Sequence, residues 1–231
     1  MKIVNKIITF LGAAAVFPVL ITQTFASVIL SVDKESLAYS FLNVILGQDN
    51  QITGSRLGIQ KSLVDFFDYI TGKTTSTIDF KKVISSLPAE AVALKKYVIA
   101  ALILVAVGVL ITIVIMGTAL FTNAYKTIIG LSLGGAASFL AAIVVFGKAA
   151  RPFLDGTIDV ASSILPLLIN GESVLGSLAS AAISGAVSVD SLGLGGAVYG
   201  AMIALFAVAV WEFAYYITIP KEDKAAKKVK A

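Results

Sequence analysis

The sequence contains neither cysteine nor histidine in its 231 residues. Without cysteine there is no disulfide, thiolate nucleophile or thiolate metal site. Without histidine, haem ligation by imidazole and the usual general base of hydrolytic triads are also excluded. The chain also lacks phosphate-binding glycine motifs, nucleophile elbows and metalloprotease signatures. These absences predict a protein that is not an enzyme and binds no cofactor or metal ion.

Charged residues are scarce and apolar ones abundant. Only 14% of residues are charged and 58% are hydrophobic, against about 25% and about 45–50% in an average soluble domain. A soluble protein of this size could not bury so much apolar surface in one core. We therefore predict an integral membrane protein in contact with lipid. No basic cluster is interleaved with aromatic residues, so nucleic acid is not an expected partner.

Long uncharged runs predict four membrane-spanning helices in an all-α integral membrane protein. A bilayer core of about 30 Å requires about 20 apolar residues of helix. The predicted spans fall in residues 1–32, 97–125, 126–147 and 191–220. Such a plan resembles the layout of claudins and tetraspan proteins. Those families carry paired cysteines in their outer loops and this chain has none, so neither residues nor function carries over.

Two outer loops, residues 33–96 and 148–190, are predicted to contain amphipathic helices. In the first loop, one helical face would carry Ile59, Leu63, Phe66, Phe67 and Ile70. That pattern favours a cap of helices over a sheet. In the second loop, residues 173–189 are uncharged and rich in Ser, Ala and Gly. This stretch is compatible with a re-entrant piece, a buried outer helix or a fifth span.

The first apolar run has two interpretations. Lys2 and Lys6 precede it and Ala26 follows a small-residue pattern, as in a cleaved signal peptide. The run continues beyond that point and is longer than a signal core of about 7–15 residues. We therefore favour an uncleaved span, kinked at Pro18 because proline removes a backbone hydrogen bond.

Basic residues near the helix ends set the expected orientation. Residues 221–231 form a short basic tail that contains Lys221, Lys224, Lys227, Lys228 and Lys230. With Lys2 and Lys6, the tail favours a multi-pass cell-membrane protein with both termini in the cytoplasm. The tail is equally compatible with binding of anionic lipid.

Small residues recur every four positions in the last two predicted spans. The sets are Gly130, Gly134, Ser138 and Ala142 in the third span, and Gly196, Gly200 and Ala204 in the fourth. This spacing lets helix backbones approach closely in lipid. The two ladders predict either self-association or docking to a partner helix. The alternative is that the two spans pack on each other within one chain.

Glu212 is the ionisable residue inside a predicted span, which makes it a candidate ion or pairing site. Aromatic neighbours such as Trp211 and Tyr215 are typical of the membrane interface. Glu212 could therefore instead sit at headgroup depth, bonded to water or Lys126. Paired carboxylates at helical spacing, such as Asp65 with Asp68 and Asp155 with Asp159, are better interpreted as solvated faces than as catalytic groups.

Two functions follow from these patterns. The first is a non-enzymatic structural or accessory subunit of a membrane assembly, which forms homo-oligomers or binds other membrane subunits through its small-residue faces. The alternative is an oligomeric pore, channel or small-solute or ion carrier, motivated by Glu212 and the Pro18 kink. An enzyme has the least support.

Overall fold

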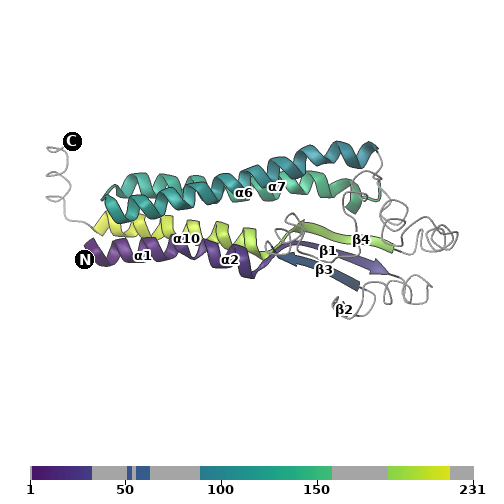
Figure 1. The fold of residues 1–231 in the computed structure, drawn as a ribbon, viewed down its shortest axis with the longest axis horizontal. Coiled ribbons are helices and arrows are strands. Elements are labelled where there is room, and N and C mark those ends of the chain that lie inside the picture. The colour runs from purple at the N-terminus through teal and green to yellow at the C-terminus, as the bar shows by residue number, and fades with distance from the viewer. Residues whose placement is uncertain (1, 33–50, 54–55, 63–88, 158–186, 219–231) are drawn as a thin grey trace, which may run out of the picture. The chain divides into compact units, whose positions relative to one another are not determined.

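The computed structural model describes residues 2–32, 51–53, 56–62, 89–157 and 187–218, which form helices and one sheet (Figure 1). They belong to two units, and each is considered by itself.

The helical unit draws on residues 1–21, 102–142 and 197–231, and the second unit on residues 22–101 and 143–196. Helices α6 (Ala89–Phe121) and α7 (Tyr125–Leu154) contribute residues to both.

Among the described residues, four helices are long and apolar enough to cross a membrane, as the uncharged runs predict. They are Ile3–Thr22, Leu94–Phe121, Tyr125–Leu154 and Gly196–Thr218, with 20, 28, 30 and 23 residues. Each reaches the length of about 20 residues that a bilayer core requires. The last of them is α10 (Gly196–Thr218). Large apolar side chains point outward along these helices, which suits contact with lipid.

The first of these helices is interrupted close to Pro18, where a kink is predicted. Helix α1 (Lys2–Ala14) ends, a turn follows, and α2 (Val16–Thr22) begins. Pro18 has no N–H to donate to the carbonyl of Ala14, four residues earlier, and its ring crowds that group. Regular hydrogen bonding resumes with Val19 N, which donates to Ala15 O at 3.3 Å.

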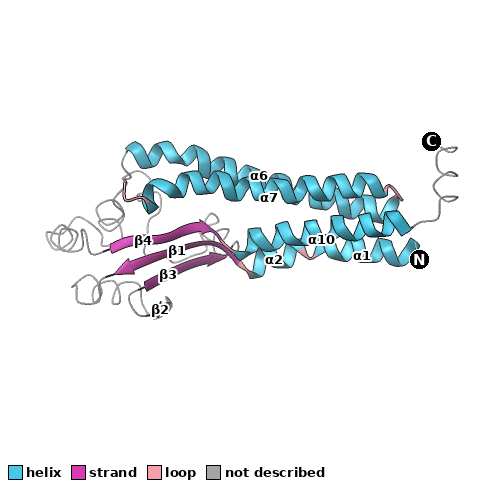
Figure 2. Cartoon of the chain, turned by 180° about the vertical axis from the view of Figure 1, so that it is seen from behind, coloured by secondary structure: helices cyan, strands magenta, loops and turns pink. Residues whose placement is uncertain are grey.

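A four-stranded antiparallel sheet lies in the second unit, with strands in the order β2-β3-β1-β4 (Figure 2). The strands are β1 (Thr24–Val32), β2 (Gln51–Thr53), β3 (Arg56–Ser62) and β4 (Val187–Leu194). Strand β1 is central, because Ser27 pairs with Gln60 of β3 and with Gly193 of β4.

The close approach of two chain segments next to the sheet requires a glycine. Gly195 N donates to Phe25 O at 2.7 Å. A Cβ at position 195 would collide with the carbonyl oxygen of Thr24. The absence of a side chain therefore lets the end of β4 close against β1 just before α10 begins.

The sheet corrects the expectation of an all-α protein. Residues 24–32 continue the first apolar run in sequence but form β1, so the first helix ends at Thr22 rather than near residue 32. Likewise, residues 191–194, which were assigned to the start of the last span, belong to β4, and the helix begins at Gly196. β-branched residues such as Val28 and Ile29 suit a strand, and pairing with β3 and β4 satisfies their backbone groups.

The first outer loop also differs where it is described. Ile59, placed on a helical face by the sequence pattern, belongs to β3. The rest of that face, Leu63 to Ile70, lies outside the described residues, as do residues 173–186 and the tail 221–231.

Small residues bring the helices of the helical unit together. A Cβ on Gly108 of α6 would lie 2.8 Å from Cζ of Phe139 on α7, a ring that is fully buried. A Cβ on Gly135 of α7 would lie 2.6 Å from Cδ1 of Leu205 on α10. Figure 1 shows α6 beside α7, and α1 and α2 beside α10. Glycines thus sit where neighbouring helices contact each other.

Candidate functional site

The most specific site in the helical unit surrounds Glu212, whose side chain is fully buried. One carboxyl oxygen, Oε1, accepts two hydrogen bonds from α1. Asn5 Nδ2 donates at 2.9 Å, and Thr9 Oγ1 donates as well. Trp211 Nε1 in turn donates to Asn5 Oδ1 at 2.8 Å. A polar cluster therefore joins the first and last helices, which are more than 200 residues apart in sequence.

Local structure explains how these side chains meet. Asn5 and Thr9 are four residues apart, so they lie one above the other on the same face of α1. A glycine of α1 follows nearby, and a Cβ on Gly12 would lie 2.8 Å from Cγ2 of Val208 on α10. Close contact at Gly12 keeps α1 and α10 near enough for the two donors to reach Glu212.

The second carboxyl oxygen of Glu212, Oε2, is buried and has no hydrogen-bond partner among the residues that the structure describes. No lysine or arginine nitrogen in the described ranges forms an ion pair with it. Lys6 Nζ instead donates to the carbonyl oxygen of Leu120 at 3.2 Å. Lys126 Nζ lies 5.6 Å from the centroid of the Tyr216 ring, so the lysine that the sequence suggested contacts an aromatic ring instead.

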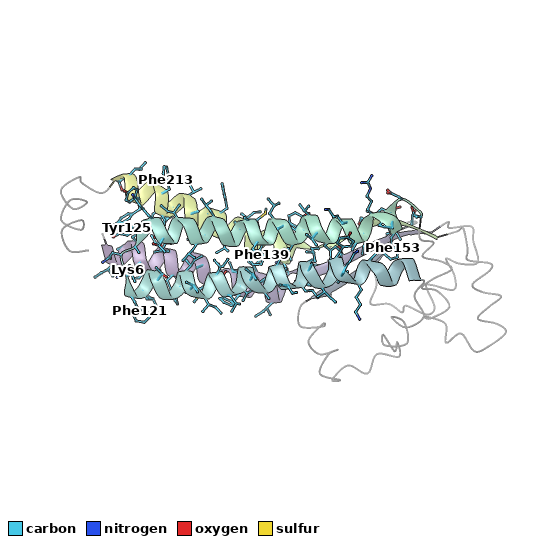
Figure 3. All side chains as sticks on the ribbon, turned by 90° about the horizontal axis from the view of Figure 1, so that it is seen from above. Lys6, Phe121, Tyr125, Phe139, Phe153 and Phe213 are labelled. Carbon is cyan, nitrogen blue, oxygen red and sulfur yellow. The ribbon has the colours of Figure 1, made fainter. Side chains whose placement is uncertain are left out.

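The cluster lies towards an aromatic end of the helical unit. Lys6, Phe121, Tyr125 and Phe213 gather at one end in Figure 3. The rings of Tyr125 and Tyr215 meet edge to face, with centroids 5.4 Å apart. Tyrosines and lysines at one helix end are typical of a membrane interface, but Glu212 itself is turned inward.

The ladder of α7 divides between two faces. Gly130 and Gly134 are exposed, and a Cβ added to either would meet no atom within 4 Å. Ser138 and Ala142 are buried, and Ser138 Oγ donates to the carbonyl oxygen of Leu104 on α6 at 2.7 Å. A four-residue step advances 40° beyond a full helical turn, so the ladder winds from the outside to the inside.

In the ladder of α10, too, only some of the small residues contact another helix of the same chain. A Cβ on Gly200 would lie 2.6 Å from Cγ1 of Val19, so this glycine faces α2. Ala204 is partly exposed. Gly196 belongs to the second unit, where its nearest neighbour would be Gln23 Oε1 at 3.8 Å.

Sequence reasoning missed both donors to Glu212. Asn5 precedes the apolar run, and Thr9 is one of several threonines in the apolar runs. Their four-residue spacing on one face was the available signal. The glycines that fill the interior, Gly108 and Gly135, were missed because they belong to no repeat.

Catalytic and metal-binding groups are sparse. The described ranges contain no group of three or more acidic side chains that could hold a metal ion. Asp155 accepts a hydrogen bond from Arg151 Nε at 3.2 Å in an exposed pair, and such pairs add little stability. Asp159, Asp65 and Asp68 lie outside the described residues. No family model, curated protein or solved structure matches this chain.

Proposed function

We propose that this protein is a non-enzymatic structural or accessory subunit of a membrane assembly, which associates through the outward glycine face of α7. This face consists of Gly130 and Gly134. The observation that carries the proposal is that these two glycines, four residues apart, are both exposed and have open space where a Cβ would be, whereas the exposed Gly147 has no second glycine at that spacing. Interior contacts account for Gly108, Gly135 and Gly200, but not for these two.

An outward pair of glycines four residues apart suits a second helix. Inside a membrane, apolar side chains gain little free energy when they exchange lipid for protein contacts, because lipid tails are equally apolar. Association then depends on close backbone packing, which small residues allow. The same face on two copies is self-complementary, as a two-fold dimer requires. A second copy is therefore the first partner we propose, and another membrane subunit is the alternative.

Both termini are proposed to lie in the cytoplasm, as the basic residues favour. Each of the four apolar helices would then cross the membrane once.

The proposal is tested by the mass of the detergent-solubilised complex. We expect Gly130→Leu with Gly134→Leu to weaken self-association at least tenfold, about 1.4 kcal/mol. Leucine would hold the two backbones apart, yet it meets no atom of its own chain at these positions. Gly147→Leu is the matched control, because Gly147 is also exposed on α7 with open space around it, on another side of the helix. An unchanged mass in the double variant, measured by light scattering across dilution, would reject the face as the contact.

An oligomeric pore or carrier is the second candidate, favoured by one observation. Buried carboxyl groups in membrane helices commonly mark ion pathways, and Oε2 of Glu212 has no hydrogen-bond partner within the described ranges. Ion flux into liposomes that Glu212→Gln abolishes would favour this function. The absence of flux would leave the structural role.

A further inference from the structure

We propose that Glu212 is a proton-binding site inside the helical unit, with the proton carried on Oε2. This proposal goes beyond the structural role and does not depend on the glycine face. The carboxyl group would take up one H⁺ to become the neutral acid and release the same H⁺ to become the carboxylate.

The hydrogen bonds assign different roles to the two oxygens. Oε1 receives both donors, Asn5 Nδ2 and Thr9 Oγ1, so its lone pairs are occupied. Oε2 is equally buried and accepts no hydrogen bond from the described part of the chain. In a neutral carboxylic acid one oxygen accepts hydrogen bonds and the other carries the proton. The arrangement therefore resembles a carboxylic acid whose carbonyl oxygen is Oε1.

The surroundings favour a proton over other cations. A buried carboxylate without a counter-charge is costly, and no lysine or arginine of the described ranges neutralises it by an ion pair. A metal ion would need several oxygen ligands, but the hydroxyl of Thr9 and the amide of Asn5 already direct hydrogen atoms towards Oε1. A proton needs only Oε2.

The other titratable groups at this end of the helical unit have their own contacts. On α1, Lys6 Nζ donates to the carbonyl oxygen of Leu120. On α7, Tyr125 packs against Tyr215 of α10, and Lys126 contacts Tyr216 of α10. Helix α6 contributes no titratable side chain between Tyr97 and its end at Phe121.

The position of Glu212 gives its proton a short route to water. Glu212 lies six residues before the end of α10 at Thr218, or roughly 9 Å along the helix axis at 1.5 Å per residue. Lys6 and Tyr125 mark the same end (Figure 3). Exchange would therefore occur with the side of the membrane where α10 ends.

Infrared spectroscopy of the full-length protein in lipid nanodiscs tests the proposal. We expect a carboxylic acid C=O band in mildly acidic buffer that disappears at alkaline pH, and that Glu212→Gln removes. Thr9→Val should shift this band to higher frequency, because the carbonyl oxygen loses a hydrogen bond. Thr112→Val is the matched control: Thr112 is also buried, but its hydroxyl donates to Gly108 O within its own helix. It should leave the band unchanged.

A second measurement uses the protein without substitutions, so it does not depend on whether a variant folds. Dicyclohexylcarbodiimide, an apolar reagent, adds to protonated carboxyl groups in membranes and leaves a stable acylurea that mass spectrometry locates. We expect it to modify Glu212 in acidic buffer and much less in alkaline buffer, with sodium ions having no effect at constant pH. Protection by sodium ions would overturn the proposal in favour of a metal-ion site. Absence of both the infrared band and the label in acidic buffer would overturn it outright.

Discussion

Replacing Gly108 by alanine should separate the effect of interhelical packing from that of helix propensity. The new Cβ would lie 2.8, 2.9 and 3.1 Å from three ring atoms of Phe139. The ring cannot easily move away, because Phe139 is fully buried. Inserting a methyl group into such a packed site costs about 1–3 kcal/mol.

Gly117→Ala is the matched control on the same helix. A Cβ at position 117 meets no atom within 4 Å. Both substitutions carry the propensity gain of alanine over glycine, about 1 kcal/mol or less. That gain cancels in the comparison, so Gly108→Ala should be less stable than Gly117→Ala by about 1–3 kcal/mol.

The assay is reversible unfolding in mixed detergent micelles, followed by circular dichroism and tryptophan fluorescence. Adding Phe139→Leu should relieve the clash, so Gly108→Ala should cost much less in that background. If Gly108→Ala stabilised the protein as much as Gly117→Ala, α6 and α7 would not pack at this point. Gly108→Ala could also lower the free energy of unfolding equally in the Phe139 and the Phe139→Leu backgrounds. In that case the Phe139 ring would not be the cause of the loss.

Two further predictions concern the ends of the chain. We expect the first helix to be retained in the mature protein, because Asn5 and Thr9 supply both donors to Glu212; an intact mass that lacks the first 26 residues would contradict this. We also expect both termini on the cytoplasmic side, so a single cysteine at Ala231 should react with a membrane-impermeant maleimide only after cells are opened. Reaction in intact cells would place the tail outside.

The four apolar helices could be predicted from the sequence, because the thickness of a bilayer fixes the length of an apolar run. An irregularity near Pro18 could be predicted as well, since a missing N–H acts locally, and the structure shows an interruption between α1 and α2. The sheet could not be recognised by run length, because β1 is as apolar as the helix before it. Residues 187–194 alternate apolar with small or polar side chains, except where Asp190 and Ser191 follow each other, and this was a usable signal. Which strands pair depends on contacts between residues far apart in sequence.

Only part of the candidate site around Glu212 could be predicted from the sequence. Glu212 stands out because charge is rare within apolar runs. Its hydrogen-bond donors, Asn5 and Thr9, do not stand out. Polar residues near the start of a helix are common, and their role is apparent only when the helix that packs against them is known. The outward direction of Gly130 and Gly134 also depends on where α6 and α10 pack against α7, which the four-residue spacing alone leaves open.

We propose that the outward glycine face of α7 binds a second copy of the chain, and cysteine cross-linking in the native membrane can detect this contact. The protein has no cysteine of its own, so a single Gly134→Cys variant reports on one position. Close packing would bring two such residues within the Cα separation of about 4–7 Å that a disulfide needs. We expect an oxidised dimer with Gly134→Cys and none with Gly147→Cys. Equal cross-linking of both variants, or of neither, would contradict it.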